Sequence, residues 1–305
     1  MALATDGNAQ PPQTAGWASR VRMVLDRSVN AWIDHRDSSK GAALAFYTLF
    51  SIAPILVLAI AGAGYIFGAE AAQGDIIRQV EGLVGRNGAQ AIEALLAGAR
   101  DPTSGLAATM LASVLLLVGA ASVFVELKGS LDEVWGSEPR TGLPIIVFLR
   151  TRLHAFGLVL VLAFLLLISL VLSAAFAVLE RYAGGIWSSS YGILAILSSV
   201  LAFTVIACLF AVIYKVLPDA PLSWHDVWIG AVFTAGMFSI GKYVIGLYLG
   251  NGGVATSFGA VGSLIALLLW VYYSAQIFFF GAEFTRQYAL GFGSLRAKCR
   301  VADAL

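Results

Sequence analysis

Charged side chains are scarce in this sequence: Asp, Glu, Lys and Arg together make up 12% of the 305 residues, whereas 59% are hydrophobic. So little polar surface cannot cover a soluble body of this size. The mean hydropathy of +0.84 points the same way, and the sequence predicts a membrane protein. The formal net charge is only +1, which excludes the massed basic face that binding to nucleic acid requires.

Cysteine and histidine are also sparse. The two cysteines, Cys208 and Cys299, provide no disulfide framework. The three histidines, His35, His154 and His225, lie far apart in the sequence and lack the spacing of a metal site. The GxSxG, P-loop and GxGxxG motifs are absent. We therefore expect neither an enzyme nor a bound metal or cofactor.

Long apolar runs are what the sequence has instead. A helix needs about 20 apolar residues to cross a bilayer, and six runs reach that length: 41–68, 106–125, 155–179, 193–213, 227–249 and 258–282. The sequence thus predicts an all-α integral membrane protein with six transmembrane helices. We expect the membrane domain to span 41–285, with a basic cytoplasmic tail over 286–305.

The basic residues predict the orientation, because Lys and Arg are retained on the cytoplasmic side. With the N-terminus inside, 14 of the 19 basic residues fall in inner segments, and the outer loops hold Arg78, Arg86, Arg100 and Arg181. Both termini are therefore predicted to be cytoplasmic. Residues 1–16 have no charged region followed by an apolar core, so we expect a disordered tail and no cleaved signal peptide. The first span then serves as the signal anchor.

Two segments outside the spans have helical patterns. Residues 17–40 are predicted to form an amphipathic helix at the inner interface; a soluble packing helix is the alternative. Its apolar side recurs at helical spacing through Trp17, Val21, Val24, Leu25, Trp32 and Ile33. The outer loop 69–103 is predicted to form two short amphipathic helices, broken at 86–88, that cap the outer face. Ser223 with Asp226 forms a capping-box pattern that starts the fifth span.

Lys242 is the one formal charge inside the six runs. It lies about 12 Å from the outer end of its helix. Its long side chain can cover part of that distance by snorkelling toward the outer interface. One interpretation is a tolerated interfacial lysine, solvated or paired with Glu70 or Glu180. The other is a lysine that faces inward and holds an anionic group, such as a lipid phosphate, because a solitary charge in a membrane is seldom idle.

Other candidate contacts are uncharged. Pro54 interrupts the first span and frees a backbone carbonyl, with Ser51 within one turn. This arrangement is either a packing kink or a hinge that lines a cavity. Gln276 is a further polar candidate in the sixth span. No Asp or Glu lies in the middle of a span, which argues against a pump built on an intramembrane carboxylate relay.

At the inner ends of the second and sixth spans, Glu126, Lys128, Glu283 and Arg286 suggest a polar cluster that closes an inner vestibule. The alternative is that Glu126 and Glu283 are exposed interfacial charges.

Several stretches resemble the YihY/BrkB family of bacterial inner-membrane proteins. They are GAALAFYTLFSIAPILVLAIA, GAASVFVELKGSLDEVW, YKVLPDAPLSWHDVWIGA and GAVGSLIALLLWVYYSAQIFFFGAEFTRQYA, and with GKYVIGLYLG they fall within roughly residues 30–290. The resemblance implies six spans with cytoplasmic termini in the inner membrane. An older label in the family is "ribonuclease BN". We reject it here, because the chain lacks both a His/Asp ligand cluster and a basic groove.

The sequence favours a transporter or exporter that handles a lipid-like or small solute, because a nearly charge-free interior suits acyl chains. The alternative is a non-transporting scaffold or envelope-assembly partner, and a membrane-embedded enzyme is a distant third. The expected partners are membrane lipids. The sequence leaves open whether the chain forms a homo-oligomer or binds another envelope protein.

Overall fold

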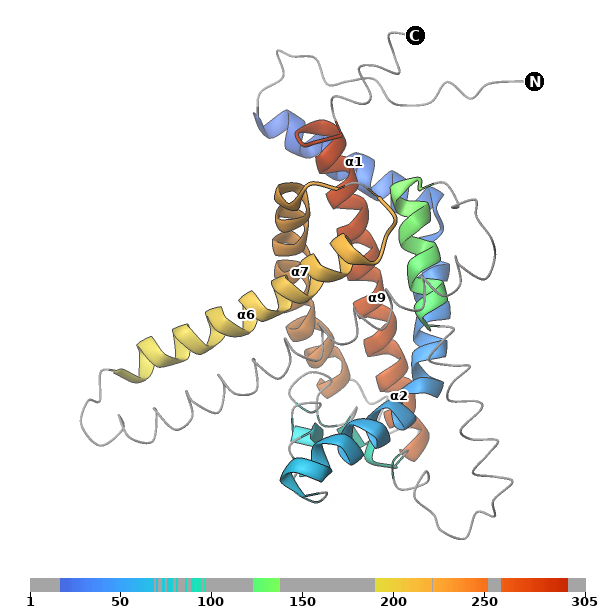
Figure 1. The fold of residues 1–305 in the computed structure, drawn as a ribbon, viewed down its shortest axis with the longest axis vertical. Coiled ribbons are helices and arrows are strands. Elements are labelled where there is room, and N and C mark those ends of the chain that lie inside the picture. Colours follow the sequence, from blue (N-terminus) through green and yellow to red (C-terminus); the bar gives the residue numbers. More distant parts are fainter. Residues whose placement is uncertain are drawn as a thin grey trace. The chain divides into compact units, whose positions relative to one another are not determined.

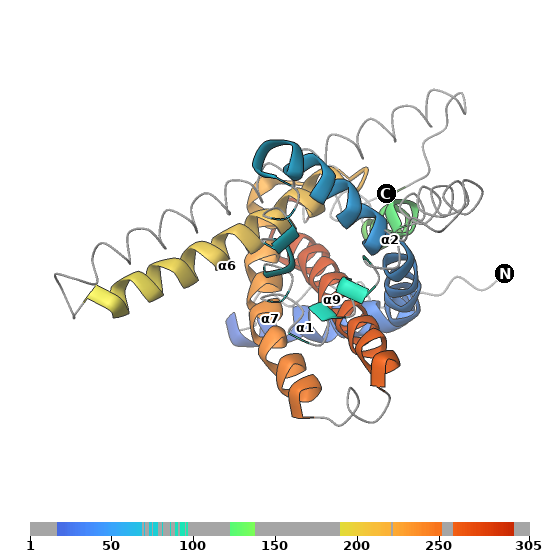
Figure 2. The same cartoon turned by 90° about the horizontal axis from the view of Figure 1, so that it is seen from below.

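The computed structural model describes residues 17–68, short stretches between 70 and 96, and residues 123–137, 190–220, 222–251 and 259–295. Every regular element in these ranges is a helix, as the all-α prediction requires. The predicted span 155–179 and most of 106–125 lie outside the described residues. The labelled helices, shown in Figures 1 and 2, are α1 (Trp17–Asp34), α2 (Asp37–Phe67), α6 (Ser190–Val216), α7 (Trp224–Asn251) and α9 (Gly259–Gly291). A further helical segment covers residues 123–135.

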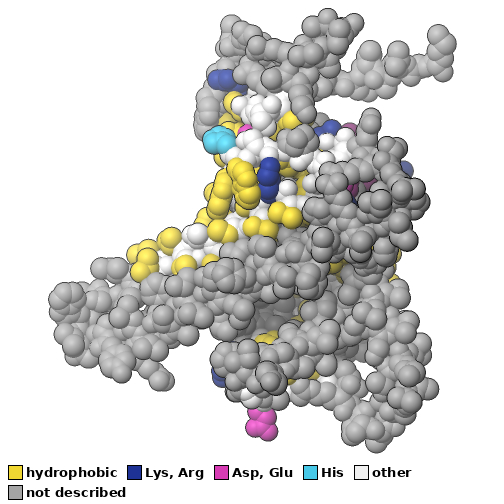
Figure 3. Space-filling view, in the orientation of Figure 1, with side chains coloured by type: hydrophobic (Ala, Val, Ile, Leu, Met, Phe, Trp, Pro, Cys, Tyr) yellow, Lys and Arg dark blue, Asp and Glu magenta, His cyan; other side chains and the backbone are white. Residues whose placement is uncertain are grey.

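Three of these helices are long and apolar enough to cross a membrane: Ile196–Val216, Trp224–Tyr248 and Leu264–Gly291. They correspond to the fourth, fifth and sixth predicted spans. Large apolar side chains remain exposed along them, among them Ile196 and Val200 on α6. Figure 3 shows hydrophobic side chains following the length of α6. A helix surface of this kind is expected to face lipid or another helix, because water would solvate it poorly.

The chain divides into two compact units. The first is drawn from residues within 1–35, 132–234 and 280–305, and the second from residues within 36–131 and 235–279. Helices α7 and α9 each contribute to both units. Each unit has its own core and its own polar contacts.

The core of the first unit is a close contact of α6, α7 and α9. Tyr214 and Thr234 are fully buried, and the Tyr214 hydroxyl lies 3.3 Å from Oγ1 of Thr234. A Cβ atom at Gly281 would overlap both of these side chains. Phe233 stacks on Phe284, with ring centroids 3.9 Å apart. The glycine thus permits an approach that any larger residue would prevent, as is common between membrane helices.

The core of the second unit joins the outer-loop residues to two long helices. Ile92 and Leu96 are buried against Ile60 of α2 and Leu267 of α9, and Ile76 and Ile77 pack on the same cluster. These loop residues lie within 69–103, the stretch predicted to form two short amphipathic helices.

A turn separates α1 from α2. Helix α1 ends at Asp34, six residues before the predicted boundary at 40, and Arg36 has a φ angle of 53°. That left-handed conformation is uncommon outside glycine and breaks the helix. Asp37 then begins α2, and its carboxylate Oδ1 lies 3.1 Å from Nζ of Lys40. An acidic residue in the first turn also interacts favourably with the helix dipole.

The predicted start of the fifth span is confirmed at Trp224. The amide of Asp226 donates to Oγ of Ser223 at the long distance of 3.5 Å, which is one half of a capping box. In a complete capping box the Asp226 carboxylate would accept a hydrogen bond from the amide of Ser223. Here it accepts hydrogen bonds from the amide and the hydroxyl of Ser294 instead, at 2.9 and 2.6 Å. Asp226 therefore fastens the turn that follows α9 to the start of α7.

Candidate functional site: buried ionisable residues on α9 and α2

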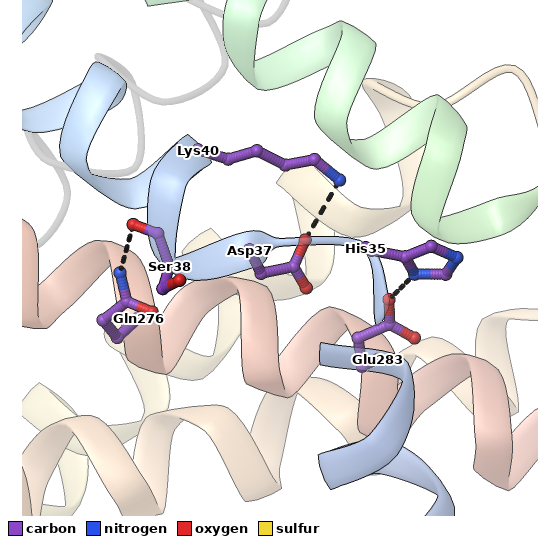
Figure 4. A network of polar contacts seen from close by, with 6 residues as sticks. All are labelled: His35, Asp37, Ser38, Lys40, Gln276 and Glu283. Atoms are coloured by element: carbon purple, nitrogen blue, oxygen red, sulfur yellow. Dashed lines mark hydrogen bonds and ion pairs between the residues drawn. The ribbon is translucent and has the colours of Figure 1, made fainter. Parts of the chain in front are cut away.

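The most unusual side chain in the first unit is Glu283, on the C-terminal half of α9. Its exposed fraction is 0%, although α9 around it is one of the three apolar helices long enough to span a membrane. Oε1 of Glu283 lies 2.5 Å from Nδ1 of His35, which follows the last turn of α1 (Figure 4). The two residues are 248 positions apart in the sequence. Folding of the first unit thus joins a buried carboxyl group to a partly buried imidazole.

A hydrogen bond between these two groups contains one proton, which either group can supply. Either the Nδ1–H group of His35 donates to the carboxylate, or a protonated carboxyl group donates to Nδ1. The His35 side chain is 25% exposed, so it connects the buried carboxyl group to the surroundings of the unit. Histidine is the common proton carrier near neutral pH. Chemically, the pair can hold, release and reorient one proton.

The second unit contains a separate polar group at the start of α2. Asp37 is fully buried, and its partner Lys40 has a side chain that is only 13% exposed. Next to them, Nε2 of Gln276 donates to the carbonyl of Ser38 at 3.3 Å (Figure 4). Oε1 of Gln276 is buried and has no hydrogen-bond partner in the part of the chain that the structure describes. A buried amide oxygen of this kind can accept a hydrogen bond from a ligand or from water.

Lys242, the predicted anion contact, lies on α7 in the second unit and is partly buried. Its ammonium is 5.8 Å from the ring centroid of Tyr243, whose exposed fraction is 71%. No carboxylate of the described residues pairs with it. Glu70 instead lines an open hollow of about 460 Å³ together with Gln73, Gly74, Ile77, Arg78 and Glu93. Glu180 lies outside the described residues.

The predicted notch in the first span is helical throughout. α2 continues unbroken from Asp37 to Phe67, through Pro54. Ser51 is 1% exposed, and its hydroxyl donates to the carbonyl of Thr48 at 3.2 Å. The side chain of Pro54 is outside the described part. Whether the kink lines a cavity stays a prediction.

The predicted inner-end cluster is distributed over both units. Glu126 and Lys128 belong to the second unit and are partly buried, whereas Glu283 and Arg286 belong to the first. Glu283 is buried and not an exposed interfacial charge, and its described partner is His35. The sequence pattern indicates no partner for His35. The available signal was weak: a carboxylate directly after an apolar run, with no histidine nearby in the sequence.

The sequence pattern also did not identify Asp37, Lys40 and Ser38 as members of a polar group. The i, i+3 spacing of Asp37 and Lys40 was visible. Nothing in the pattern indicated that Gln276, 238 positions from Ser38, would bond to the same turn.

The description "Virulence factor BrkB" belongs to a family model that matches residues 29–298 of this chain. A UPF0761 membrane protein of Verminephrobacter eiseniae is 28% identical over 80% of this chain and 57% of its own length. A UPF0761 membrane protein of Pseudomonas aeruginosa is 28% identical over 86% of this chain and 59% of its own length. The chain thus spans about three fifths of the length of these relatives. No solved structure matches it.

Proposed function

Because the chain belongs to the YihY/BrkB family of bacterial membrane proteins, we propose that it is a transporter or exporter of a lipid-like or small solute. In this proposal it lies in the inner membrane, crosses it six times and has both termini in the cytoplasm. It moves its substrate without chemical conversion, so it is not an enzyme, and membrane lipids are its immediate partners.

The observation that carries the proposal is the buried carboxyl group of Glu283 and its hydrogen bond to His35. An ionisable residue inside a membrane-spanning body is costly, and such residues commonly mark a substrate path or a proton relay. An inert scaffold of apolar helices has no need of a carboxylate with 0% exposure. The pair provides a protonatable group inside the folded body, which the sequence pattern did not predict. Its hydrogen bond can change with the state of transport.

Two further features support a lipid-like substrate. The described spans expose apolar side chains to their surroundings, and Lys242 offers a cation without a carboxylate partner among the described residues. In the proposal, Lys242 contacts the anionic group of the substrate at the outer end of α7, and Ser51, Pro54 and Gln276 line its path.

A second candidate, a scaffold or envelope-assembly partner, is favoured by the tight helix contacts of the first unit. A Cβ atom at Gly230 would come within 2.6 Å of Cβ and Cγ2 of Thr285, and Gly281 is equally enclosed. Rigid packing of this kind suits a structural role. The exposed apolar surface of α6 would then bind a helix of a partner protein.

Reconstitution distinguishes the two candidates. Purified protein is inserted into vesicles that contain fluorescent phosphatidylglycerol or fluorescent phosphatidylcholine, and movement between leaflets is followed by chemical quenching of the outer leaflet. We expect wild type to accelerate movement of at least one lipid over empty vesicles, and Glu283→Gln to slow it. The control Asp26→Asn removes a carboxylate whose side chain is 69% exposed and should leave transport unchanged.

Vesicles with wild type that behave like empty ones, for both lipids and under an imposed proton gradient, would contradict transport of a lipid-like substrate. Cross-linking that then recovered one defined envelope protein at the α6 surface would support the scaffold.

A further inference from the structure

The helical segment 123–135 ends in a turn with a regular backbone cap and two side-chain donors that have no partner among the described residues. Gly136 has a φ of 60°, its amide donates to the carbonyl of Glu133 at 3.0 Å, and the amide of Ser137 donates to the carbonyl of Asp132 at 2.8 Å. This is a Schellman motif, which satisfies the last carbonyls of a helix.

Both of these donors are buried. Trp135 is 8% exposed, and its indole Nε1 has no hydrogen-bond partner among the described residues. The hydroxyl of Ser137, two residues later, is buried and also lacks one there. Buried polar groups in folded proteins are nearly always paired, so a neighbouring pair of unsatisfied donors calls for an acceptor from outside the described part of the chain.

Arg286 of α9 brings a positive charge to the same turn. Its Nη2 lies 3.4 Å from the position that a Cβ atom of Gly136 would occupy, so the absence of a side chain there leaves the guanidinium next to the turn. Arg286 is partly buried, and no carboxylate in the described part of the chain pairs with it. The carboxylate one turn earlier, Glu283, is bonded to His35.

We propose that Trp135, Ser137 and Arg286 form a binding site for a phosphate group. An arginine fork beside hydroxyl and indole N–H donors matches an oxyanion with several acceptor oxygens, because each donor finds its own lone pair. A cation or an apolar ligand would leave all three groups unsatisfied. Only the first unit contributes to the site, since all three residues belong to it.

The inference rests on the proposed transporter function and narrows the substrate to a phosphate-bearing anion. The phosphate comes either from the headgroup of an anionic phospholipid or from a small soluble phosphate. Both sources present the same charged oxygens to Arg286. A phospholipid differs from a soluble phosphate because its acyl chains must be held in the membrane at the same time.

The experiment measures binding by the intact protein to two probes. The first probe is inorganic phosphate, added to protein in nanodiscs of phosphatidylcholine and followed by calorimetry. The second is phosphatidylglycerol, supplied in nanodiscs at one part to three of phosphatidylcholine, with retained lipid counted by native mass spectrometry. Binding of either probe identifies the source of the phosphate.

Three variants and one control test the site. Arg286→Gln should weaken binding about 10-fold or more, and Trp135→Phe, which removes the N–H but keeps an aromatic ring, about 5-fold. Ser137→Ala should have a smaller effect in the same direction. Arg22→Gln removes an equal charge from an arginine whose side chain is 85% exposed on α1, and binding should stay within about twofold of wild type.

If Arg286→Gln and Trp135→Phe bind each probe as tightly as wild type does, the proposed site is wrong. It is also wrong if wild type binds neither probe. If Arg286→Gln fails to fold, Trp135→Phe and Ser137→Ala test the same donors by the same measurement. The lipid-movement assay is read separately. If the variants lose phosphate binding and wild type moves no lipid, the site is upheld and transport of a lipid-like substrate is contradicted. If wild type moves lipid and the variants bind both probes as wild type does, the site is contradicted and transport is upheld.

Discussion

Replacement of Gly230 by alanine tests whether the contact of α7 with α9 is as tight as the structure indicates. The new Cβ atom would lie 2.6 Å from both Cβ and Cγ2 of Thr285, and it would overlap the Thr285 hydroxyl. Thr285 cannot easily move, because it is fully buried and its hydroxyl donates to the carbonyl of Gly281 at 2.6 Å. The overlap must therefore be relieved by separating the helices.

The magnitude follows from two opposing effects. Overpacking a close-packed core costs typically about 1–3 kcal/mol, and alanine recovers up to about 1 kcal/mol through its better helix propensity. We expect Gly230→Ala to destabilise the protein by about 1–2 kcal/mol. Gly236 provides the matched control on the same helix, since no neighbouring side chain or segment of the described residues lies within 4 Å of the position that its Cβ atom would occupy. Gly236→Ala should be neutral or slightly stabilising.

Stability is measured by thermal unfolding of both variants in the same detergent, with the double variant Gly230→Ala/Thr285→Gly as a rescue. Moving the side chain from α9 to α7 removes the overlap, so the double variant should recover part of the loss. Equal melting temperatures for Gly230→Ala and Gly236→Ala would refute the close contact. A rescue that fails while Gly230→Ala is destabilised would show that Thr285 is not the clashing residue.

Three further predictions concern the membrane arrangement and the proposed substrate path. A topology reporter fused after Leu305 and one inserted near Gly88 should report opposite sides of the membrane, because basic residues predominate in the inner segments; the same side for both would remove the six-span arrangement. If Pro54 forms a hinge, Pro54→Ala should keep the protein folded but change the labelling rate of a cysteine placed at Ser51, and unchanged labelling would leave a packing kink. Lys242→Gln should co-purify with less anionic lipid than wild type, by quantitative lipid extraction; equal lipid and equal or greater stability would make Lys242 a tolerated interfacial charge.

Much of the helical framework follows from local pattern. The predicted run 193–213 lies within α6 (Ser190–Val216), and 227–249 lies within α7 (Trp224–Asn251). Apolar length and the Ser223 cap were sufficient because a helix satisfies its backbone within itself. The predicted run 258–282 ended too early, since α9 continues to Gly291. Its last turns contain Glu283, Arg286 and other polar residues, which hydropathy alone excludes from a span.

The candidate sites could be predicted only in part. The sequence identified Arg286 and Glu283 as polar residues at a helix end. It did not indicate that Glu283 pairs with His35 or that Arg286 lies next to Gly136. The partners of both residues come from distant segments: His35 from the end of α1, and the Gly136 turn from the helical segment 123–135. Sequence pattern describes neighbours along one helix, whereas these contacts depend on which helices meet.

The sequence by itself determined that this is a membrane protein of helices, the position of three of those helices, and its family. These properties depend on composition and on periodicities of a few residues, which the chain carries wherever it folds. Only the tertiary structure decided that Glu283 is buried against His35, that Asp226 holds Ser294, and that Arg286 lies next to Gly136. Each of these contacts joins groups that are far apart in the chain, so their burial and charge become defined only when the helices pack.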